Sequence, residues 1–295
     1  MKHSITDPAP VVLLTGARSG IGRALARLLW ASSYRVVVTA RGDVLNAFRS
    51  EAFEDTDRFL MRSLDVTNTE QREALIEELT DRWGGVDILI NNAGICYRSV
   101  LEHMGEQDVT LQMETNFVGP MALAHLVIPG MREKRFGRII NISSVSGMTA
   151  MPTMGYYSAS KYALEGASES LWYEMRPWNV QVVLVQPGFI NSKAFRRVYY
   201  SDAARAAIAT EGAYAVYYNE MERLVSFLMT RAHATSERTA KRIYKVMEMK
   251  RPHLREPVTI DAHFFGMIRR LLPRRIYHAL LYRSLPSVKK WGPDA

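Results

Sequence analysis

The amino-acid sequence predicts an α/β protein built on a doubly wound parallel sheet. Apolar runs of strand length alternate with amphipathic stretches of helix length along the chain. Several of these runs consist of consecutive Val, Ile and Leu residues, as expected for strands that helices cover on both faces. A glycine-rich turn joins the first apolar run to the first amphipathic stretch. Ligands of such sheets bind beyond the carboxyl ends of the strands, so polar motifs there are candidate site residues.

The predicted elements alternate over most of the chain. Strands are expected at Val11–Thr15, Arg35–Thr39, Arg58–Leu64, Val86–Asn91, Gly137–Ser143, Val180–Gln186 and Pro257–Ile260. Helices are expected at Gly20–Ala31, Val44–Phe53, Thr69–Trp83, Glu106–Lys134 and Ser158–Trp178.

Composition agrees with a globular chain. The 295 residues are 47% hydrophobic and 23% charged, and the chain is long enough to bury a full core. Cys96 is the single cysteine, so no intrachain disulfide can form, and we interpret it as a packing residue rather than a catalytic thiol. Neither a signal-peptide core nor an apolar run of the roughly 20 residues that span a bilayer is present. These observations predict a cytoplasmic protein, and we expect no bound metal.

The glycine-rich turn is Thr15-Gly16-Ala17-Arg18-Ser19-Gly20-Ile21-Gly22. It lies between a strand and a helix, which is the context that a dinucleotide-binding turn requires. Glycines allow close approach of the backbone to a pyrophosphate, and the helix N-terminus attracts the negative charge. Glycines are also common at strand–helix junctions, so the turn by itself leaves a structural role open.

Tyr157 and Lys161 form a second motif. Residues four apart on a helix lie on the same side, so the phenol and the ammonium are within reach of each other. A nearby cation favours the phenolate and lowers the pKa of the tyrosine from its usual value of about 10. We therefore expect Tyr157 to exchange a proton with an alcohol or a carbonyl near neutral pH.

Taken together, these motifs resemble the short-chain dehydrogenases and reductases. The matching residues occur in that family's order: Thr15 to Gly22, Asn91-Asn92-Ala93-Gly94, Asn116, Ser144, Tyr157, Lys161 and Pro187-Gly188. The resemblance implies a Rossmann-like fold and hydride transfer between a nicotinamide cofactor and an alcohol or carbonyl substrate. The overall pattern is similar to the 17β-hydroxysteroid and retinol dehydrogenase branch.

The resemblance implies four catalytic residues. Tyr157 would be the acid/base, and Lys161 would lower its pKa while binding the nicotinamide ribose. Ser144, at the end of the fifth strand, would orient the substrate oxygen, whereas strand alternation turns the competing candidate Ser143 to the other side. Asn116 would hold a water that links Lys161 to solvent, and a local distortion of its long helix is the alternative interpretation.

The end of the second strand indicates the preferred cofactor. An acidic residue there would accept hydrogen bonds from the ribose hydroxyls of NAD, but this chain has Ala40 followed by Arg41. A guanidinium suits the extra phosphate of NADP, and Arg18 adds a second cation. We expect NADP(H) to be favoured over NAD(H). Asp43 complicates this interpretation, and solvated loop arginines are the alternative.

Further cofactor contacts are implied at the ends of the third, fourth and sixth strands. The residues are Asp65, Val66, Asn92, Ala93, Gly94, Pro187, Gly188, Ile190 and Ser192. Ser192 stands where the family usually has Thr and retains the hydroxyl that would bond the carboxamide. For the Asp and Asn side chains, structural roles in turns are the alternative.

Residues 193–255 are predicted to form a substrate lid and the helix that follows it. The lid is rich in aromatic residues: Phe195, Tyr199, Tyr200, Tyr214, Tyr217, Tyr218 and Phe227. With Met148, Met151 and Met154 before the catalytic Tyr, this composition favours a bulky apolar substrate, steroid-like, retinoid-like or long-chain, and hence a role in lipid or steroid metabolism. Ordinary core packing is the alternative.

Residues 263–295 are predicted to be a basic amphipathic extension of a single catalytic domain, residues 1–262. From His263 to Lys290 the sequence holds seven Lys or Arg and no Asp or Glu, interleaved with large apolar residues and divided by Pro273. Such a segment suits peripheral contact with an anionic membrane. Docking of its apolar face on this subunit or on a partner is the alternative. No nucleic-acid motif accompanies the charge, so we expect no nucleic-acid partner. We expect a homodimer or homotetramer.

The sequence is compatible with two functions. The first is an NADP-dependent oxidoreductase acting on a hydrophobic small molecule, and the second is a nucleotide-binding regulatory or scaffold protein without turnover. The complete set of Asn116, Ser144, Tyr157 and Lys161 favours the enzyme, because a scaffold would not need all four.

Overall fold

The computed structural model describes residues 9–48, 50–192 and 198–292. Within these ranges seven parallel strands form one sheet, in the order β3-β2-β1-β4-β5-β6-β7. The strands are β1 (Val11–Leu14), β2 (Arg35–Ala40), β3 (Phe59–Ser63), β4 (Ile88–Asn91), β5 (Gly137–Ile142), β6 (Val180–Gln186) and β7 (Arg255–Pro257). The strand order reverses between β1 and β4, which opens a crevice at their carboxyl ends. The predicted doubly wound parallel sheet is confirmed.

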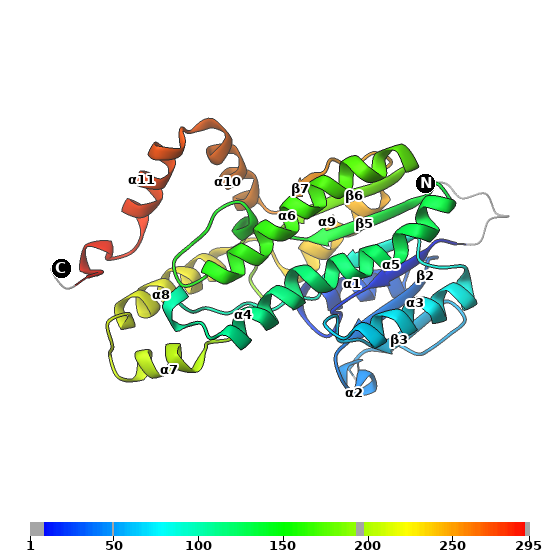
Figure 1. Cartoon of the computed structure of the whole chain (residues 1–295), viewed down its shortest axis with the longest axis horizontal. Helices are drawn as coiled ribbons and strands as arrows, with labels where there is room; N and C mark the ends of the chain where they lie inside the picture. The colour runs from blue at the N-terminus through cyan, green and yellow to red at the C-terminus, as the bar shows by residue number, and fades with distance from the viewer. Residues whose placement is uncertain (1–8, 49, 193–197, 293–295) are drawn as a thin grey trace.

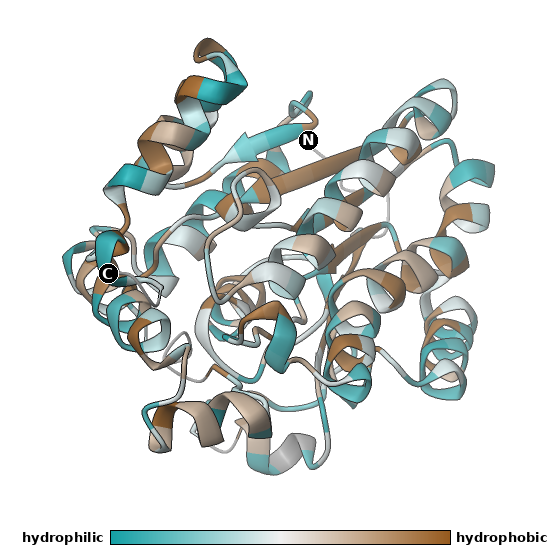
Figure 2. Cartoon of the chain, turned by 60° about the vertical axis from the view of Figure 1, so that its left-hand side comes forward, coloured by the Kyte–Doolittle hydropathy of each residue, from teal (hydrophilic) through white to brown (hydrophobic). Residues whose placement is uncertain are grey.

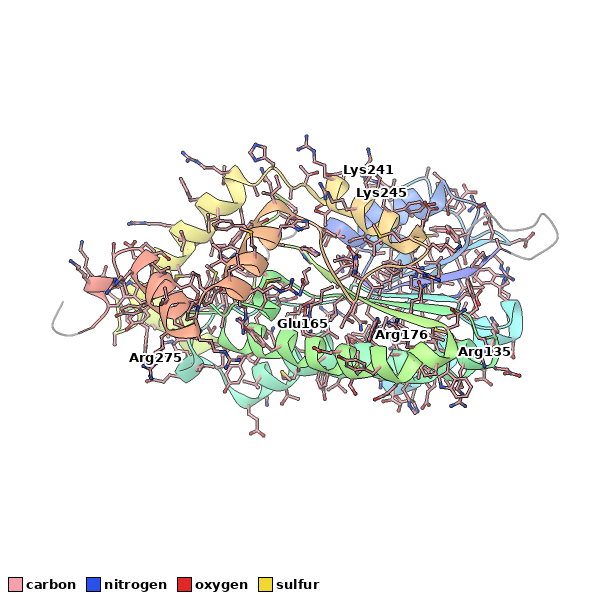
Figure 3. All side chains as sticks on the ribbon, turned by 90° about the horizontal axis from the view of Figure 1, so that it is seen from above. Arg135, Glu165, Arg176, Lys241, Lys245 and Arg275 are labelled. Carbon is pink, nitrogen blue, oxygen red and sulfur yellow. The ribbon has the colours of Figure 1, made fainter. Side chains whose placement is uncertain are left out.

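Helices cover both faces of the sheet (Figure 1). One face carries α1 (Gly20–Trp30), α2 (Val44–Phe48) and α9 (Ser236–Glu248), and the other carries α3 (Thr69–Trp83), α5 (Gly119–Glu133) and α6 (Gly155–Met175). Figure 3 shows Lys241 and Lys245 of α9 on one side of the sheet and Arg135 and Arg176 on the opposite side. The sheet is therefore the middle of three layers.

Alternation along the strands divides the core between the two faces. Val12 and Leu14 of β1 pack toward α1 and α9, whereas Leu13 between them packs toward α3 and α5. All three side chains are fully buried. The inner strands are accordingly coloured as hydrophobic in Figure 2, whereas the short edge strand β7 is hydrophilic and the helices alternate between hydrophobic and hydrophilic residues. This double burial explains why the strands have continuous apolar sequences.

Two predicted elements were misplaced. The seventh strand was predicted at Pro257–Ile260, but β7 is Arg255–Pro257, because Thr259 already precedes the first turn of α10 (Ile260–Leu271). The second helix was predicted to reach Phe53, but α2 ends at Phe48. Phe53 and Val258, which were expected to continue these elements, pack against the core from irregular backbone, and Ile260 already belongs to α10, so apolar content alone misjudged the ends.

The long helix predicted at Glu106–Lys134 is interrupted. It consists of α4 (Glu106–Met113), a π-helical turn at Glu114–Val118 and α5. Asn116 lies in the π turn, as the expected local distortion requires.

The part of the chain after β6 forms helices beside the carboxyl edge of the sheet. The lid contains α7 (Asp202–Ala209) and α8 (Ala215–Arg231), and α10 is followed by α11 (Arg274–Ser284). Pro273 separates α10 from α11, as predicted, and both helices extend away from the sheet (Figure 1). The helix α10 begins at Ile260, shortly before the predicted domain boundary at residue 263. Among the described residues, no helix is long and apolar enough to cross a bilayer.

Candidate functional site

A cleft of about 510 Å³ lies at the carboxyl ends of the strands and brings most of the predicted site residues together. The predicted residues that line it are Gly16, Arg18, Ser19, Gly20, Ile21, Gly22, Arg41, Asp65, Val66, Asn92, Ala93, Gly94, Ser144, Tyr157, Lys161, Pro187, Gly188, Ile190 and Ser192. Thr15 and Asn116 do not line the cleft but lie directly behind it, almost fully buried. Their hydrogen bonds hold the backbone segments that form the cleft.

The glycine turn is held against the end of β4. The Thr15 hydroxyl accepts hydrogen bonds from the backbone N–H groups of Asn92 and Ala93, both at 3.0 Å. The Asn92 side chain donates in return to the carbonyl oxygens of Thr15 and Gly16. These bonds fix the ends of β1 and β4 on either side of the crevice.

Two glycines in the turn cannot carry a side chain. Gly16 has a φ of +69°, and a Cβ atom there would lie 2.6 Å from the Cα atom of Ala93. A Cβ atom on Gly22 would overlap the carbonyl oxygen of Gly16. The N-terminus of α1 therefore opens into the cleft without obstruction. Its first turn holds no acidic residue, and the Ser19 side chain makes no capping bond. This cradle fits the pyrophosphate of a dinucleotide.

Asn116 lies behind the cleft and fixes the segment that follows β4. Its side-chain oxygen accepts a bond from the Ile95 N–H at 2.9 Å, and its nitrogen donates to the Ile95 carbonyl and the Ser160 hydroxyl. These bonds anchor the segment after β4 to α6, on which Tyr157 and Lys161 lie. Asn116 thus helps to position α6 beside the segment that follows β4.

Tyr157, Ser144 and Lys161 form a buried cluster at one end of the cleft. The Tyr157 hydroxyl is hydrogen-bonded to Ser144, and the Lys161 ammonium lies 5.9 Å from the centre of the Tyr157 ring. The Lys161 ammonium donates a 2.8 Å hydrogen bond to the carbonyl of Ile142 at the end of β5. Burial lowers the pKa of Lys161 to about 8.

The expectation that Lys161 lowers the pKa of Tyr157 was wrong for this arrangement. Burial raises the pKa of Tyr157 above its ordinary value, and the hydrogen bond with Ser144 offsets only part of this effect. The ammonium is held by Ile142 rather than by the phenol. Tyr157 is therefore a neutral phenol, which is the form that donates a proton.

The two serines after β5 have different surroundings. The Ser144 hydroxyl accepts a hydrogen bond from the Ser146 N–H at 3.1 Å and also bonds Tyr157. The Ser143 hydroxyl is buried without a hydrogen-bond partner. The contact with Tyr157 thus belongs to Ser144.

Arg18 and Arg41 lie exposed on the rim of the cleft. The Arg41 guanidinium is 3.9 Å from the carboxylate of Asp65, a weak and solvated pair. Asp43 accepts a hydrogen bond from the Asn46 N–H and so stabilises the first turn of α2. Among the described residues, the Asp43 carboxylate forms no ion pair with Arg18 or Arg41.

The apolar lid residues lie in more than one place. Val198 and Tyr199 line the cleft, and Phe195 falls outside the described residues. The three methionines expected near the substrate contact other parts of the molecule and are absent from the described lining of the cleft: Met154 is buried, Met151 packs against α8, and Met148 faces α10. For these methionines, the packing interpretation agrees with their positions.

Cys96 lines the cleft, but its thiol is unreactive near neutral pH. Burial raises the pKa of its thiol to about 12, so the thiolate is not formed near neutral pH. The structure agrees with its interpretation as a packing residue.

The loop Pro187–Ile190 is held by residues that the sequence did not single out. The Thr259 hydroxyl accepts a bond from the Gly188 N–H at 2.8 Å, and Asp261 accepts one from the Phe189 N–H at 2.6 Å. Both lie around the start of α10, far along the sequence from the loop. No local motif marks them, since their role depends on the pairing of β7 with β6.

Comparison with known proteins agrees with this geometry. The sequence profile of the short chain dehydrogenases matches residues 10–202. This chain belongs to the short-chain dehydrogenase family. A 3-ketodihydrosphingosine reductase of Bacteroides thetaiotaomicron is 40% identical over 182 residues, which are 62% of this chain and 64% of that protein. The aligned part of this chain thus covers less than two thirds of that relative's length.

Solved structures show the same fold. A short-chain dehydrogenase from Streptomyces avermitilis superimposes with a TM-score of 0.78 at 29% identity, covering 96% of this chain and all of that one. A metagenomic short-chain oxidoreductase solved with NADP has a TM-score of 0.56 at 32% identity, over 62% of this chain and 83% of that one. A 4-hydroxyisoleucine dehydrogenase solved with NADH also has a TM-score of 0.56, at 29% identity over 63% of this chain and 78% of that one. Relatives of this short-chain dehydrogenase thus bind either nicotinamide cofactor.

Proposed function

We propose that this chain is an NADP-dependent oxidoreductase that transfers hydride between the nicotinamide cofactor and a hydrophobic alcohol, ketone or aldehyde. The observation that carries the proposal is one cleft that joins the glycine cradle to the buried cluster of Ser144, Tyr157 and Lys161. When bound, the nicotinamide cofactor supplies the hydride. A regulatory nucleotide-binding protein would need the cradle but not a buried phenol at the other end of the cleft.

In reduction, Ser144 and Tyr157 hold the substrate oxygen, and the neutral phenol donates the proton to it. Lys161 stays positively charged at pH 7 because its pKa of about 8 lies above that value. Its charge stabilises the phenolate that remains after the proton has left. Asn116 keeps the segment after β4 in place behind this pair.

The cofactor preference rests on charge at the rim of the cleft. Arg18 and Arg41 are exposed cations beside Ala40, a position without a carboxylate. Two guanidinium groups favour the additional phosphate of NADP through charge-assisted hydrogen bonds. The NADP complex of the metagenomic relative supports this preference, and the NADH complex of the other relative provides the alternative.

The substrate is a hydrophobic carbonyl compound or alcohol, with steroid-like, retinoid-like and long-chain molecules as candidates. Val198 and Tyr199 give the cleft an apolar wall on the lid side. The similarity to a reductase named for 3-ketodihydrosphingosine supports a long apolar chain beside a ketone.

Turnover with a panel of steroids, retinoids and long-chain aldehydes tests the proposal and its cofactor preference together. We expect oxidation of NADPH with an apolar carbonyl compound and slower reaction with NADH. Exchange of Arg41→Asp should shift the ratio of kcat/KM for NADPH over NADH by about tenfold or more toward NADH. Arg251→Asp, in the exposed loop after α9, is the matched control and should leave the ratio unchanged. An unchanged ratio in Arg41→Asp would contradict the role of Arg41.

We also propose peripheral contact of α10 and α11 with an anionic membrane. Ile260, Phe264, Met267 and Leu271 are spaced along one side of α10 and are between 52% and 78% exposed. The segment from His263 to Lys290 carries seven cations and no acid, so its charge complements an anionic surface. Large exposed apolar groups beside cations are the features of an interfacial helix rather than of a solvated one.

Co-sedimentation with phosphatidylserine vesicles tests this contact. The full chain should bind, and more weakly as salt increases, since each cation contributes about 1 kcal/mol near the surface. The double exchange Phe264→Glu and Leu271→Glu should abolish binding, whereas Phe227→Glu, an exposed apolar position on α8, should retain it. Equal binding by both variants would contradict the role of this surface, and a change of oligomeric state in the double variant alone would show that the surface is a protein interface.

A further inference from the structure

A second cavity lies between α6 and α10, apart from the cleft. Its volume is about 860 Å³, a size typical of small-molecule sites. One wall is formed by α6 near Glu165, which is labelled in Figure 3, and the other by residues 262–271 of α10. Among the described residues, this cavity, the α6–α10 groove, shares no lining residue with the cleft. The proposed reaction therefore does not account for it.

The acidic group of the groove is already paired within the protein. Glu165 is 6% exposed, and its carboxylate accepts hydrogen bonds from Arg255 at 2.8 Å and from Gln186 at 2.9 Å. Arg255 also donates to Glu169 at 2.7 Å, so its charge is used by two carboxylates. Among the described lining residues Glu165 is the single acid, whereas three arginines are present. The lining thus carries an excess of positive charge.

That excess lies on the two arginines near the C-terminal end of α10. The Nη1 atom of Arg269 donates a 2.7 Å hydrogen bond to the Tyr162 hydroxyl, which joins α10 to α6. Arg270, the next residue, also lines the groove. No Asp or Glu in the described part of the chain forms an ion pair with either arginine, so the protein itself supplies no counter-charge to them.

The side of the groove formed by α10 is largely apolar. Met267 and Leu271 line it, yet their side chains are 53% and 70% exposed. Met148, after the turn that follows Ser144, adds a third apolar side chain. On the α6 side there is open space at Gly166, where a Cβ atom would meet nothing within 4 Å. An apolar chain in the groove would remove these side chains from water.

We propose that the α6–α10 groove binds one acyl chain of an anionic membrane lipid, with the headgroup phosphate at Arg269 and Arg270. Charge selects the headgroup, because guanidinium groups bind phosphate oxygens through charge-assisted and bidentate hydrogen bonds. Position selects the source, because Met267 and Leu271 belong both to the groove and to the exposed side of α10 that we assign to the membrane. The site requires no turnover in the cleft.

Binding of monomeric lysolipids to the full chain tests the headgroup site. By titration calorimetry below the aggregation concentration, lysophosphatidylglycerol should bind at least about tenfold more tightly than lysophosphatidylcholine of equal chain length. The double exchange Arg269→Gln and Arg270→Gln should remove this preference. Arg274→Gln with Arg275→Gln makes the same change of charge on exposed positions of α11 and should retain it.

Filling the groove tests where the acyl chain lies. Gly166→Leu adds a side chain in the open space and raises helix propensity, so the fold should be retained while both lysolipids bind about tenfold or more weakly. Gly130→Leu is the matched control, because Gly130 is also helical and a Cβ atom there meets nothing within 4 Å. It should bind both lipids like the wild type.

Each contrary result overturns a stated part of the proposal. Wild-type binding by Gly166→Leu would place the chain elsewhere, the cleft included, and the groove would be rejected. If the wild-type protein does not prefer lysophosphatidylglycerol, the phosphate site is wrong whether or not the variants fold. A change of oligomeric state in Gly166→Leu, measured by sedimentation velocity, would instead identify an interface between copies of the chain. Because the probes are monomeric and no reaction is followed, these outcomes are independent of vesicle binding and of the oxidoreductase function.

Discussion

Replacement of Tyr157 by Phe should lower turnover by about 10² to 10⁴-fold, with little change in NADPH affinity. The exchange removes the buried phenol that is hydrogen-bonded to Ser144 and retains the ring. The cradle that would hold the pyrophosphate lies at the opposite end of the cleft and is formed by other residues. Steady-state kinetics and fluorescence titration with NADPH measure the two effects separately.

Tyr162→Phe provides a matched control on the same helix. Its hydroxyl accepts a hydrogen bond from Arg269 at 2.7 Å, at the surface and outside the lining of the cleft among the described residues. This variant should turn over at nearly the wild-type rate. Near-wild-type kcat in Tyr157→Phe would mean that another group donates the proton.

Replacement of Gly16 by Ala should weaken NADPH binding and lower the free energy of unfolding together. The residue has a left-handed φ, and the added Cβ atom would press against the backbone of Ala93 at 2.6 Å. Each of these two effects costs about 1 to 3 kcal/mol. The turn must therefore shift away from the end of β4, and the hydrogen bonds of Thr15 with Asn92 and Ala93 shift with it.

Gly130→Ala is the corresponding control. Gly130 lies inside α5, and a Cβ atom there would meet nothing within 4 Å, so the higher helix propensity of Ala should stabilise the protein by up to about 1 kcal/mol. Chemical denaturation and NADPH titration of both variants give the comparison. Wild-type affinity and stability in Gly16→Ala would show that the turn has room that the structure does not contain.

The sheet and the strand ends could be predicted because they depend on local sequence. Continuous apolar strands and the glycine turn determine where the crevice lies, and the motifs at Asn92 and Ser144 follow strands whose ends were predicted nearly correctly. The π turn at Asn116 was also anticipated, since Asn disfavours a regular helix. The resemblance to known dehydrogenases then supplied the roles, which the residues alone would not.

The remaining features depend on long-range packing. Burial raises the pKa of Tyr157, and the Lys161 ammonium lies 5.9 Å from the centre of its ring; neither feature is encoded in their spacing of four residues. The contacts of Asp261 with the loop after β6 likewise require β7 to be in place.

Deuterium transfer tests the oxidoreductase function most directly. NADPH labelled at its transferable hydrogen is incubated with the protein and the panel of apolar carbonyl compounds, and the products are analysed by mass spectrometry. We predict one deuterium in the alcohol product, on the former carbonyl carbon, and almost none with Tyr157→Phe. Tight binding of NADPH without label in any product would contradict an oxidoreductase and identify a nucleotide-binding protein without turnover.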